Sequence, residues 1–287
     1  MVERFSRFPS ALAERSRPAR FGDVPVLLAH PDWSAPAPTV IWMHGRTVSK
    51  EIDPGRYLRW IRAGIAACAI DLPGHGERLD APRQGKAGTI GVIAQMVREI
   101  DRIVESLAAP EHAGLFDLDR LAIGGMSAGG MAALRRLCDP HPFIAAAVEG
   151  TTGCLEDLYL PTPGPAPDET PPDQTLPDDA TDHRAQSTAP REAIRAVDAA
   201  AHIATWRPIP LLMLHSETDR VIPFALAQRF ARLARTRSYQ AGADPALVQL
   251  RSWPETGAPD EHAGFGRVAA EAKTAQVEFF QRTLRVG

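Results

Sequence analysis

The sequence lacks several features that would identify broad classes of protein. No apolar run approaches the roughly 20 residues that a helix needs to cross a bilayer, and residues 1–20 lack the apolar core of a secretory signal. The net charge is only −3, so the basic surplus of a nucleic-acid-binding protein is missing. We therefore expect neither a membrane nor a nucleic acid as partner, and a cytoplasmic location.

The N-terminal segment is rich in arginine, which would suit an organellar transit peptide. Its acids Glu3 and Glu14 are atypical of such peptides, which are poor in acidic residues. We therefore expect a solvated N-terminal arm over residues 1–20.

Cysteine is also scarce. The three cysteines, Cys68, Cys138 and Cys154, are odd in number and irregular in spacing, which is typical neither of a disulfide framework nor of a zinc site. This usage favours a reducing compartment. A Gly-x-Gly-x-x-Gly pattern after the first apolar strand is missing as well, so we expect no flavin or nicotinamide cofactor. With no zinc-like cysteine spacing, we also expect no metal.

The apolar residues that are present predict alternating strands and helices. Short apolar runs predict strands, and longer runs with apolar residues three or four apart predict helices. The expected strands are 24–29, 39–43, 66–70, 120–124, 143–148, 209–214 and 247–250, and the clearest helices are 54–63, 89–107 and 266–284. Such alternation indicates an α/β fold with a mostly parallel sheet covered on both faces. Ligands of such sheets bind beyond the carboxyl ends of the strands.

One segment interrupts this rhythm. Residues 161–190 contain eight prolines, several acids and almost no large apolar residue, so they are unsuited to a packed core. A long irregular segment within a compact domain is usually a functional lid or a disordered insertion. We predict one α/β domain over residues 21–287, with a lid or cap insertion over 151–200; a floppy insertion is the alternative.

A candidate nucleophile follows the strand 120–124. Residues 125–129 read Gly-Met-Ser-Ala-Gly, and an apolar, helix-like run comes next. A Gly-x-Ser-x-Gly pattern between a strand and a helix can hold its serine on a strained turn with the hydroxyl exposed. The glycines fit because a Cβ on either side would clash with neighbouring backbone. Ser127 is therefore the predicted nucleophile.

A serine nucleophile needs a base, and the base needs an acid to orient it. Asp219 follows the strand 209–214 and is the predicted acid, with Glu217 and Glu149 as rivals. His262 lies between the last strand and the closing helix, where a loop residue can reach the serine, and is the predicted base. The other downstream histidines are less suited. His202 lies in an apolar helical stretch, His215 is too near Asp219 to be its partner on a separate loop, and His183 lies in the irregular segment.

Backbone N–H groups must also stabilise the oxyanion that forms during acyl transfer. The amide of Ala128, which follows the nucleophile, is one predicted donor. The Arg46 amide is the second, with Thr47 as rival, because Gly45 lets this loop approach closely. His44 is expected to hold the loop by hydrogen bonds. We expect the Arg46 side chain to form a surface salt bridge, with an anionic substrate group as the alternative.

Taken together, these motifs resemble the α/β-hydrolase superfamily, in its serine esterase, dienelactone-hydrolase-like and prolyl-oligopeptidase-like branch. The matching pieces run in family order over nearly the whole chain: His44-Gly45, residues 71–76 (Asp-Leu-Pro-Gly-His-Gly), Ser127 with its glycines, Asp219 with the following Val-Ile-Pro, and His262. The resemblance implies an eight-stranded, mostly parallel sheet and no cofactor. His75 of the second motif is structural in this family.

We therefore predict a serine hydrolase that cleaves small to medium carboxylic esters through an acyl-enzyme. A serine peptidase, a thioesterase or an acyltransferase could use the same scaffold. A non-catalytic binding protein is the alternative from another class, although such proteins usually lose one member of the triad. The expected partner is a small-molecule ester, and the sequence leaves open whether copies form a homo-oligomer.

Overall fold

The computed structural model describes residues 8–160 and 188–286. Eight strands form one sheet in the order β1-β2-β4-β3-β5-β6-β7-β8. Only β2 pairs antiparallel with its two neighbours, and the pairs from β4 to β8 are parallel. This arrangement confirms the predicted α/β-hydrolase fold. The strands are β1 (Ser16–Phe21), β2 (Val24–Ala29), β3 (Ala37–Met43), β4 (Ala66–Ile70), β5 (Phe116–Met126), β6 (Ala145–Glu149), β7 (Leu211–Ser216) and β8 (Val248–Trp253).

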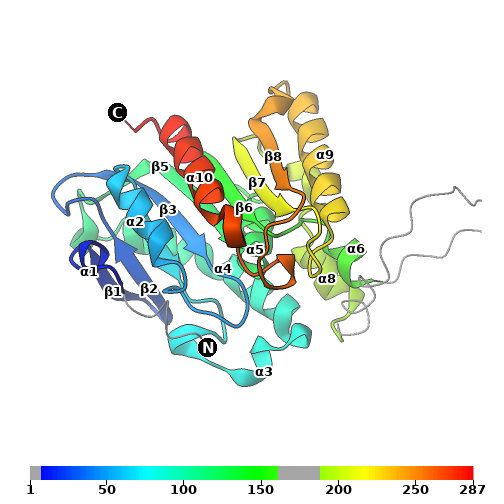
Figure 1. Ribbon diagram of the computed structural model, residues 1–287, viewed down its shortest axis with the longest axis horizontal. Helices are drawn as coiled ribbons and strands as arrows, with labels where there is room; N and C mark the ends of the chain where they lie inside the picture. The colour runs from blue at the N-terminus through cyan, green and yellow to red at the C-terminus, as the bar shows by residue number, and fades with distance from the viewer. Residues whose placement is uncertain (1–7, 161–187, 287) are drawn as a thin grey trace, which may run out of the picture.

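Helices cover both faces of the sheet (Figure 1). One face carries α1 (Ser10–Ala13), α2 (Pro54–Arg62) and α10 (Ala269–Thr283). The other carries α4 (Thr89–Leu107), α5 (Ala128–Arg136), α6 (Leu155–Tyr159), α8 (Arg191–Val197) and α9 (Phe224–Gln240), and the short α3 (Ala81–Gln84) precedes α4. Side chains of a strand alternate between the two cores. In β3, for example, Ile41 packs on the α4 and α5 side and Trp42 on the α2 and α10 side.

The sheet begins earlier in the chain than predicted. Strand β1 starts at Ser16 and pairs along its whole length with β2, so residues 16–20 belong to the sheet and not to a solvated arm. Most of its side chains are exposed or partly exposed, which is why no apolar pattern marks it. Backbone pairing with β2 holds this strand in place.

Two helices also differ from expectation. Helix α9 was not predicted. Three of its six buried residues are alanines and four arginines lie among them, which weakens the apolar periodicity. The closing helix α10 starts at Ala269, after a 3-10 turn over Gly266–Val268.

The predicted lid falls mostly outside the described residues. Residues 161–187 are not described, so the lid over 151–200 stays a prediction. Its two flanks, α6 and α8, bury Leu155, Leu158, Ile194 and Val197 in the core on the α4 side. Among the described residues, no helix is long and apolar enough to cross a bilayer.

Candidate active site

Ser127 lies on a strained turn between β5 and α5. Its φ is +50° and its ψ is −120°, a conformation that costs a residue with a side chain on the order of 1–3 kcal/mol. The surrounding structure holds the turn, because the Ser127 amide donates to the Glu149 carbonyl at 2.9 Å and the Thr151 hydroxyl donates to the Ser127 carbonyl at 2.9 Å. Ser127 therefore presents its hydroxyl from a fixed backbone.

The two glycines of the motif are required by close backbone contacts. A Cβ added to Gly125 would lie 2.6 Å from the Met43 carbonyl oxygen, and one added to Gly129 would overlap the same oxygen. The turn between β5 and α5 thus packs directly against the end of β3. This contact explains why positions 125 and 129 are both glycine.

The structure brings Ser127, His262 and Asp219 into one hydrogen-bonded chain. His262 Nε2 is 2.9 Å from Ser127 Oγ, and His262 Nδ1 is 2.8 Å from Asp219 Oδ2. Because a carboxylate only accepts hydrogen bonds, Nδ1 carries the proton and Nε2 is free to accept from the serine hydroxyl. This is the tautomer that general-base activation of a serine needs.

Asp219 is fixed by its own loop. Its Oδ1 accepts hydrogen bonds from the Val221 and Ile222 amides, both at 2.8 Å, which leaves Oδ2 directed at His262. Buried His215 also lies beside this carboxylate, with Nε2 at 3.5 Å from Oδ2, and is 2.9 Å from the Ile222 carbonyl oxygen. Burial lowers the pKa of His215, and the Asp219 charge opposes this effect.

The rival acids have other partners. The Glu149 carboxylate is bound by both terminal nitrogens of Arg56, at 2.7 and 2.8 Å, and by the Gln276 side-chain amide at 3.1 Å. Exposed Glu217 accepts a hydrogen bond from the Ser252 hydroxyl at 2.7 Å. Neither acid contacts the imidazole of His262 that Asp219 binds.

The other described downstream histidines form their hydrogen bonds with groups other than Ser127. Partly buried His202 has its Nε2 3.2 Å from the Arg195 carbonyl oxygen, and His215 faces the Ile222 carbonyl. His183 lies outside the described residues. His262 is thus the histidine that the structure places on Ser127.

Glu261 holds the loop that carries His262, a feature that sequence analysis missed. Its carboxylate accepts hydrogen bonds from the Ser216 hydroxyl at 2.7 Å, from the Thr256 amide at 2.6 Å and from the Gly257 amide at 2.6 Å. Burial by itself would raise the pKa of Glu261, but these hydrogen bonds lower it to about 2. The φ angles of Asp260 and Glu261 are +52° and +51°, so the carboxylate also ties down a strained turn.

The predicted oxyanion donors lie on either side of the serine. A Cβ added to Gly45 would lie 3.5 Å from the Ser127 Cβ, which places the loop after β3 against the nucleophile. Ala128 is the first residue of α5. Among the described residues, no acceptor is bonded to the Arg46 or Ala128 amide, so both N–H groups can donate to a substrate oxygen. Thr47, the rival donor, has φ +65°.

The loop of the oxyanion donors is anchored to the loop after β4. His44 is buried, and its Nε2 accepts from the Leu72 amide at 3.0 Å while Nδ1 bonds the Gly45 carbonyl. Lys50 donates through its Nζ and its amide to the Asp71 carboxylate, at 2.8 and 2.9 Å. Burial opposes ionisation of Asp71, but these hydrogen bonds and that of the Glu77 amide lower its pKa. His75 lies in this anchor, 5.6 Å from the His44 ring between centroids.

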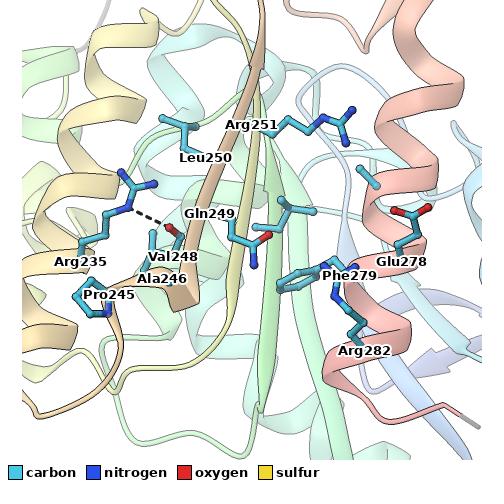
Figure 2. A pocket seen from close by; sticks show the side chains of 12 residues that line it. Arg235, Pro245, Ala246, Val248, Gln249, Leu250, Arg251, Glu278, Phe279 and Arg282 are labelled. Atoms are coloured by element: carbon cyan, nitrogen blue, oxygen red, sulfur yellow. Dashed lines mark hydrogen bonds between the residues drawn. The ribbon is translucent and has the colours of Figure 1, made fainter.

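A pocket of about 530 Å³ opens elsewhere, over the outer edge of β8 (Figure 2). It lies between α9 and α10 and is lined by the early residues of β8, whereas Ser127, Asp219 and His262 lie beyond the carboxyl ends of the strands. Its charged residues are Arg235, Arg251, Glu278 and Arg282. The pocket is therefore separate from the candidate active site. In the described part of the chain, no group of three or more His, Cys, Asp or Glu side chains could hold a metal ion.

Comparison with known proteins finds hydrolases that resemble this chain. Residues 34–163 match the family described as serine aminopeptidase, S33. The chain is 29% identical to "Esterase YjfP" of Escherichia coli (strain K12) over 272 residues, which cover 91% of this chain and 96% of that protein.

Solved structures share the fold at low sequence identity. A Mycobacterium tuberculosis puromycin-hydrolyzing peptidase superposes with a TM-score of 0.68 at 17% identity, over 95% of this chain but only 40% of the peptidase. Thermogutta terrifontis esterase 2, phosphonylated by sarin, superposes with a TM-score of 0.63 at 16% identity, over 96% of this chain and 95% of the esterase. The chain therefore has the α/β-hydrolase fold that these proteins share.

Proposed function

We propose that this enzyme is a serine hydrolase that cleaves small to medium carboxylic esters through an acyl-enzyme. The observation that carries the proposal is the unbroken hydrogen-bonded chain from Ser127 through His262 to Asp219. The esterase from Escherichia coli, which aligns with nearly the whole chain, supports an ester as substrate.

In the first half of the reaction, Ser127 Oγ attacks the ester carbonyl while His262 Nε2 takes the hydroxyl proton. The Asp219 carboxylate, 2.8 Å from His262 Nδ1, stabilises the imidazolium that forms. Collapse of the tetrahedral intermediate breaks the bond to the alcohol oxygen, and His262 gives its proton to that oxygen. The acyl group remains on Ser127.

In the second half, a water molecule takes the place of the alcohol. His262 Nε2 accepts a proton from the water as its oxygen attacks the acyl carbon. The bond to Ser127 Oγ then breaks, and His262 returns the proton to Ser127. The products are the carboxylic acid and the free enzyme.

The oxyanion of both tetrahedral intermediates is stabilised by the amides of Ala128 and Arg46. Both amides lack an acceptor among the described residues, and the Arg46 loop contacts the serine through Gly45. Prearranged donors of this kind act without reorganisation at the moment of reaction, and one donor typically contributes about 10²–10³ in kcat.

The test is hydrolysis of 4-nitrophenyl esters of increasing acyl length by the wild type and by Ser127→Ala. We expect wild-type turnover of the shorter esters and a fall of about 10⁴-fold or more in the variant, because the triad acts as a unit. An inert, folded wild type, or a Ser127→Ala variant of undiminished activity, would refute the proposal.

A peptidase is the second candidate, since the matching family is described as serine aminopeptidase and one structural relative is a peptidase. Aminoacyl 4-nitroanilides distinguish the two functions. We expect kcat/KM for an aminoacyl nitroanilide to be far below that for the matching aminoacyl ester; a nitroanilide that reacts as fast as the ester would favour the peptidase.

We further propose a cytoplasmic enzyme whose partner is its small-molecule substrate, without a nucleic acid or membrane partner. The three cysteines Cys68, Cys138 and Cys154 support this location, because all are free thiols and unpaired thiols are typical of a reducing compartment. Cell fractionation tests the location, and light scattering of the purified protein tests whether copies form a homo-oligomer.

A further inference from the structure

Arg46 places a positive charge on the loop that contacts Ser127. Its neighbour Gly45 lies against Ser127, with 3.5 Å between an added Cβ and the Ser127 Cβ. The Arg46 side chain is partly buried, and its Nη1 donates to the Gln84 carbonyl at 3.2 Å. That hydrogen bond orients the guanidinium and uses one of its five N–H groups.

No carboxylate of the described residues pairs with this guanidinium, so the surface salt bridge expected for Arg46 is missing in this part of the chain. Two fully buried cations, by contrast, are paired with carboxylates. Lys50 binds Asp71 and Glu77 at 2.8 and 2.6 Å, and Arg56 binds Glu149 at 2.7 Å. Arg46, whose neighbour Gly45 lies against Ser127, has no such pair among the described residues.

The Arg46 charge acts on groups from two other segments around the site. Burial raises the pKa of Tyr159 on α6, and the Arg46 guanidinium opposes that rise. Burial lowers the pKa of His75, in the loop after β4, and the same guanidinium adds to that effect. The Arg46 charge is therefore close enough to α6 and to the loop after β4 to act on both, and its own backbone belongs to the loop of the oxyanion donors. A negative group of a bound substrate would be stabilised there.

We propose that the Arg46 guanidinium binds a carboxylate of the substrate, so that the preferred esters carry a negative charge near the cleaved bond. This inference rests on the proposed ester hydrolysis. Guanidinium and carboxylate form two parallel N–H···O bonds, and arginine is better suited than lysine to such planar recognition. The Arg46 backbone and side chain would then act together, the amide on the oxyanion and the guanidinium on the carboxylate.

The test uses pairs of esters that differ only in this charge. One pair is mono-4-nitrophenyl adipate and its far-end primary amide, which places the carboxylate on the acyl side. The other is 4-acetoxybenzoate and 4-acetoxybenzamide, which places it on the leaving group. The measured quantity is the ratio of kcat/KM for the anionic ester to kcat/KM for the neutral one.

For the wild type we expect a ratio of about 10 or more in at least one pair. Arg46→Met should lower that ratio by about 10- to 100-fold, the range of a hydrogen bond to a charged group, and Arg46→Glu should bring it below 1. Both substitutions keep the backbone amide, and damage to the oxyanion site acts on both esters of a pair and cancels in the ratio. Arg232→Met, at an exposed position on α9, is the matched control and should leave the ratio unchanged.

The possible results separate the two proposals. Wild-type hydrolysis of all four esters with ratios near 1, unchanged in Arg46→Met, overturns the role of the Arg46 side chain and leaves ester hydrolysis intact. A folded wild type that hydrolyses none of them overturns the proposed function and this inference with it. Loss of the anionic preference in Arg232→Met as well would show a general charge effect and would also overturn the specific role of Arg46.

Discussion

Glu149 and Asp219 are two buried acids near the carboxyl ends of neighbouring strands, β6 and β7, yet they have opposite uses. Glu149 is held by both terminal nitrogens of Arg56, whose guanidinium also lies 4.3 Å from the centre of the Trp42 ring. Asp219 has no guanidinium or ammonium partner in the described part of the chain: its Oδ1 accepts from two loop amides and its Oδ2 faces His262.

The comparison shows that the partner, more than position or burial, decides what a carboxylate does here. A guanidinium neutralises Glu149 and links β6 to α2, which fixes the strand whose carbonyl receives the Ser127 amide. Asp219 faces an imidazole instead, and its negative charge stabilises His262 when that side chain becomes protonated during the reaction. Glu149 is therefore a structural acid and Asp219 the proposed catalytic one.

The largest expected effect is on catalysis, and it comes from replacing Asp219. Asp219→Asn should lower kcat by about 10⁴-fold, because an amide at this position favours the wrong imidazole tautomer. The free energy of unfolding should change much less. Steady-state kinetics and urea unfolding measure the two effects, and a variant within tenfold of the wild-type kcat would refute the role of Asp219.

The second effect is on the stability of the fold, and it comes from replacing Glu149. Glu149→Gln should destabilise the fold by about 3 kcal/mol or more, because it leaves the buried Arg56 guanidinium without its main carboxylate. The kcat of the folded fraction should stay within about tenfold of the wild type, since the Ser127 amide bonds the Glu149 backbone. Urea unfolding checks the stability.

Exposed Glu217 gives the matched control for that variant. Glu217→Gln should shift the free energy of unfolding by no more than about 0.5 kcal/mol. Equal effects of the Glu149 and Glu217 substitutions would contradict the structural role of the Arg56–Glu149 pair.

The smallest expected effect is on the pH dependence of stability. It concerns a third acid, Glu261, whose hydrogen-bond partners are neutral donors. Its pKa is lowered from 4.5 to about 2, so its stabilising contribution is fully present above pH 4.5 and is lost as the pH falls towards 2. The wild type should exceed Glu261→Gln in Tm by a constant margin above pH 5, and the margin should shrink below pH 4.5. A margin that grows on acidification would show that the Glu261 hydrogen bonds favour its protonated form.

The sequence predicted the parts of this molecule that depend on local patterns. The apolar runs of β3, β4 and β7 mark their strands, and the glycines around Ser127 mark the turn because steric contact with Met43 demands them. Strand β1 was not predicted, because its side chains show no apolar pattern. Backbone pairing with β2 holds it in the sheet.

Side-chain partners far apart in the chain could not be predicted in the same way. Arg56 and Glu149 are separated by 93 residues, and no local spacing indicates that they meet. The sequence predicted Asp219 ahead of Glu217, but the two amides of the turn after β7 that orient the Asp219 carboxylate are seen only in the folded loop. The missing carboxylate partner of Arg46 among the described residues is also a property of the fold alone.

The most direct test of the central claim, that His262 activates Ser127, is labelling with a fluorophosphonate followed by peptide mass spectrometry. We predict one stoichiometric adduct on the peptide that contains Ser127, none on that peptide in Ser127→Ala, and labelling slowed by orders of magnitude in His262→Ala. A catalytically active wild type that carries its adduct on another residue, or that labels equally fast without His262, would contradict the account.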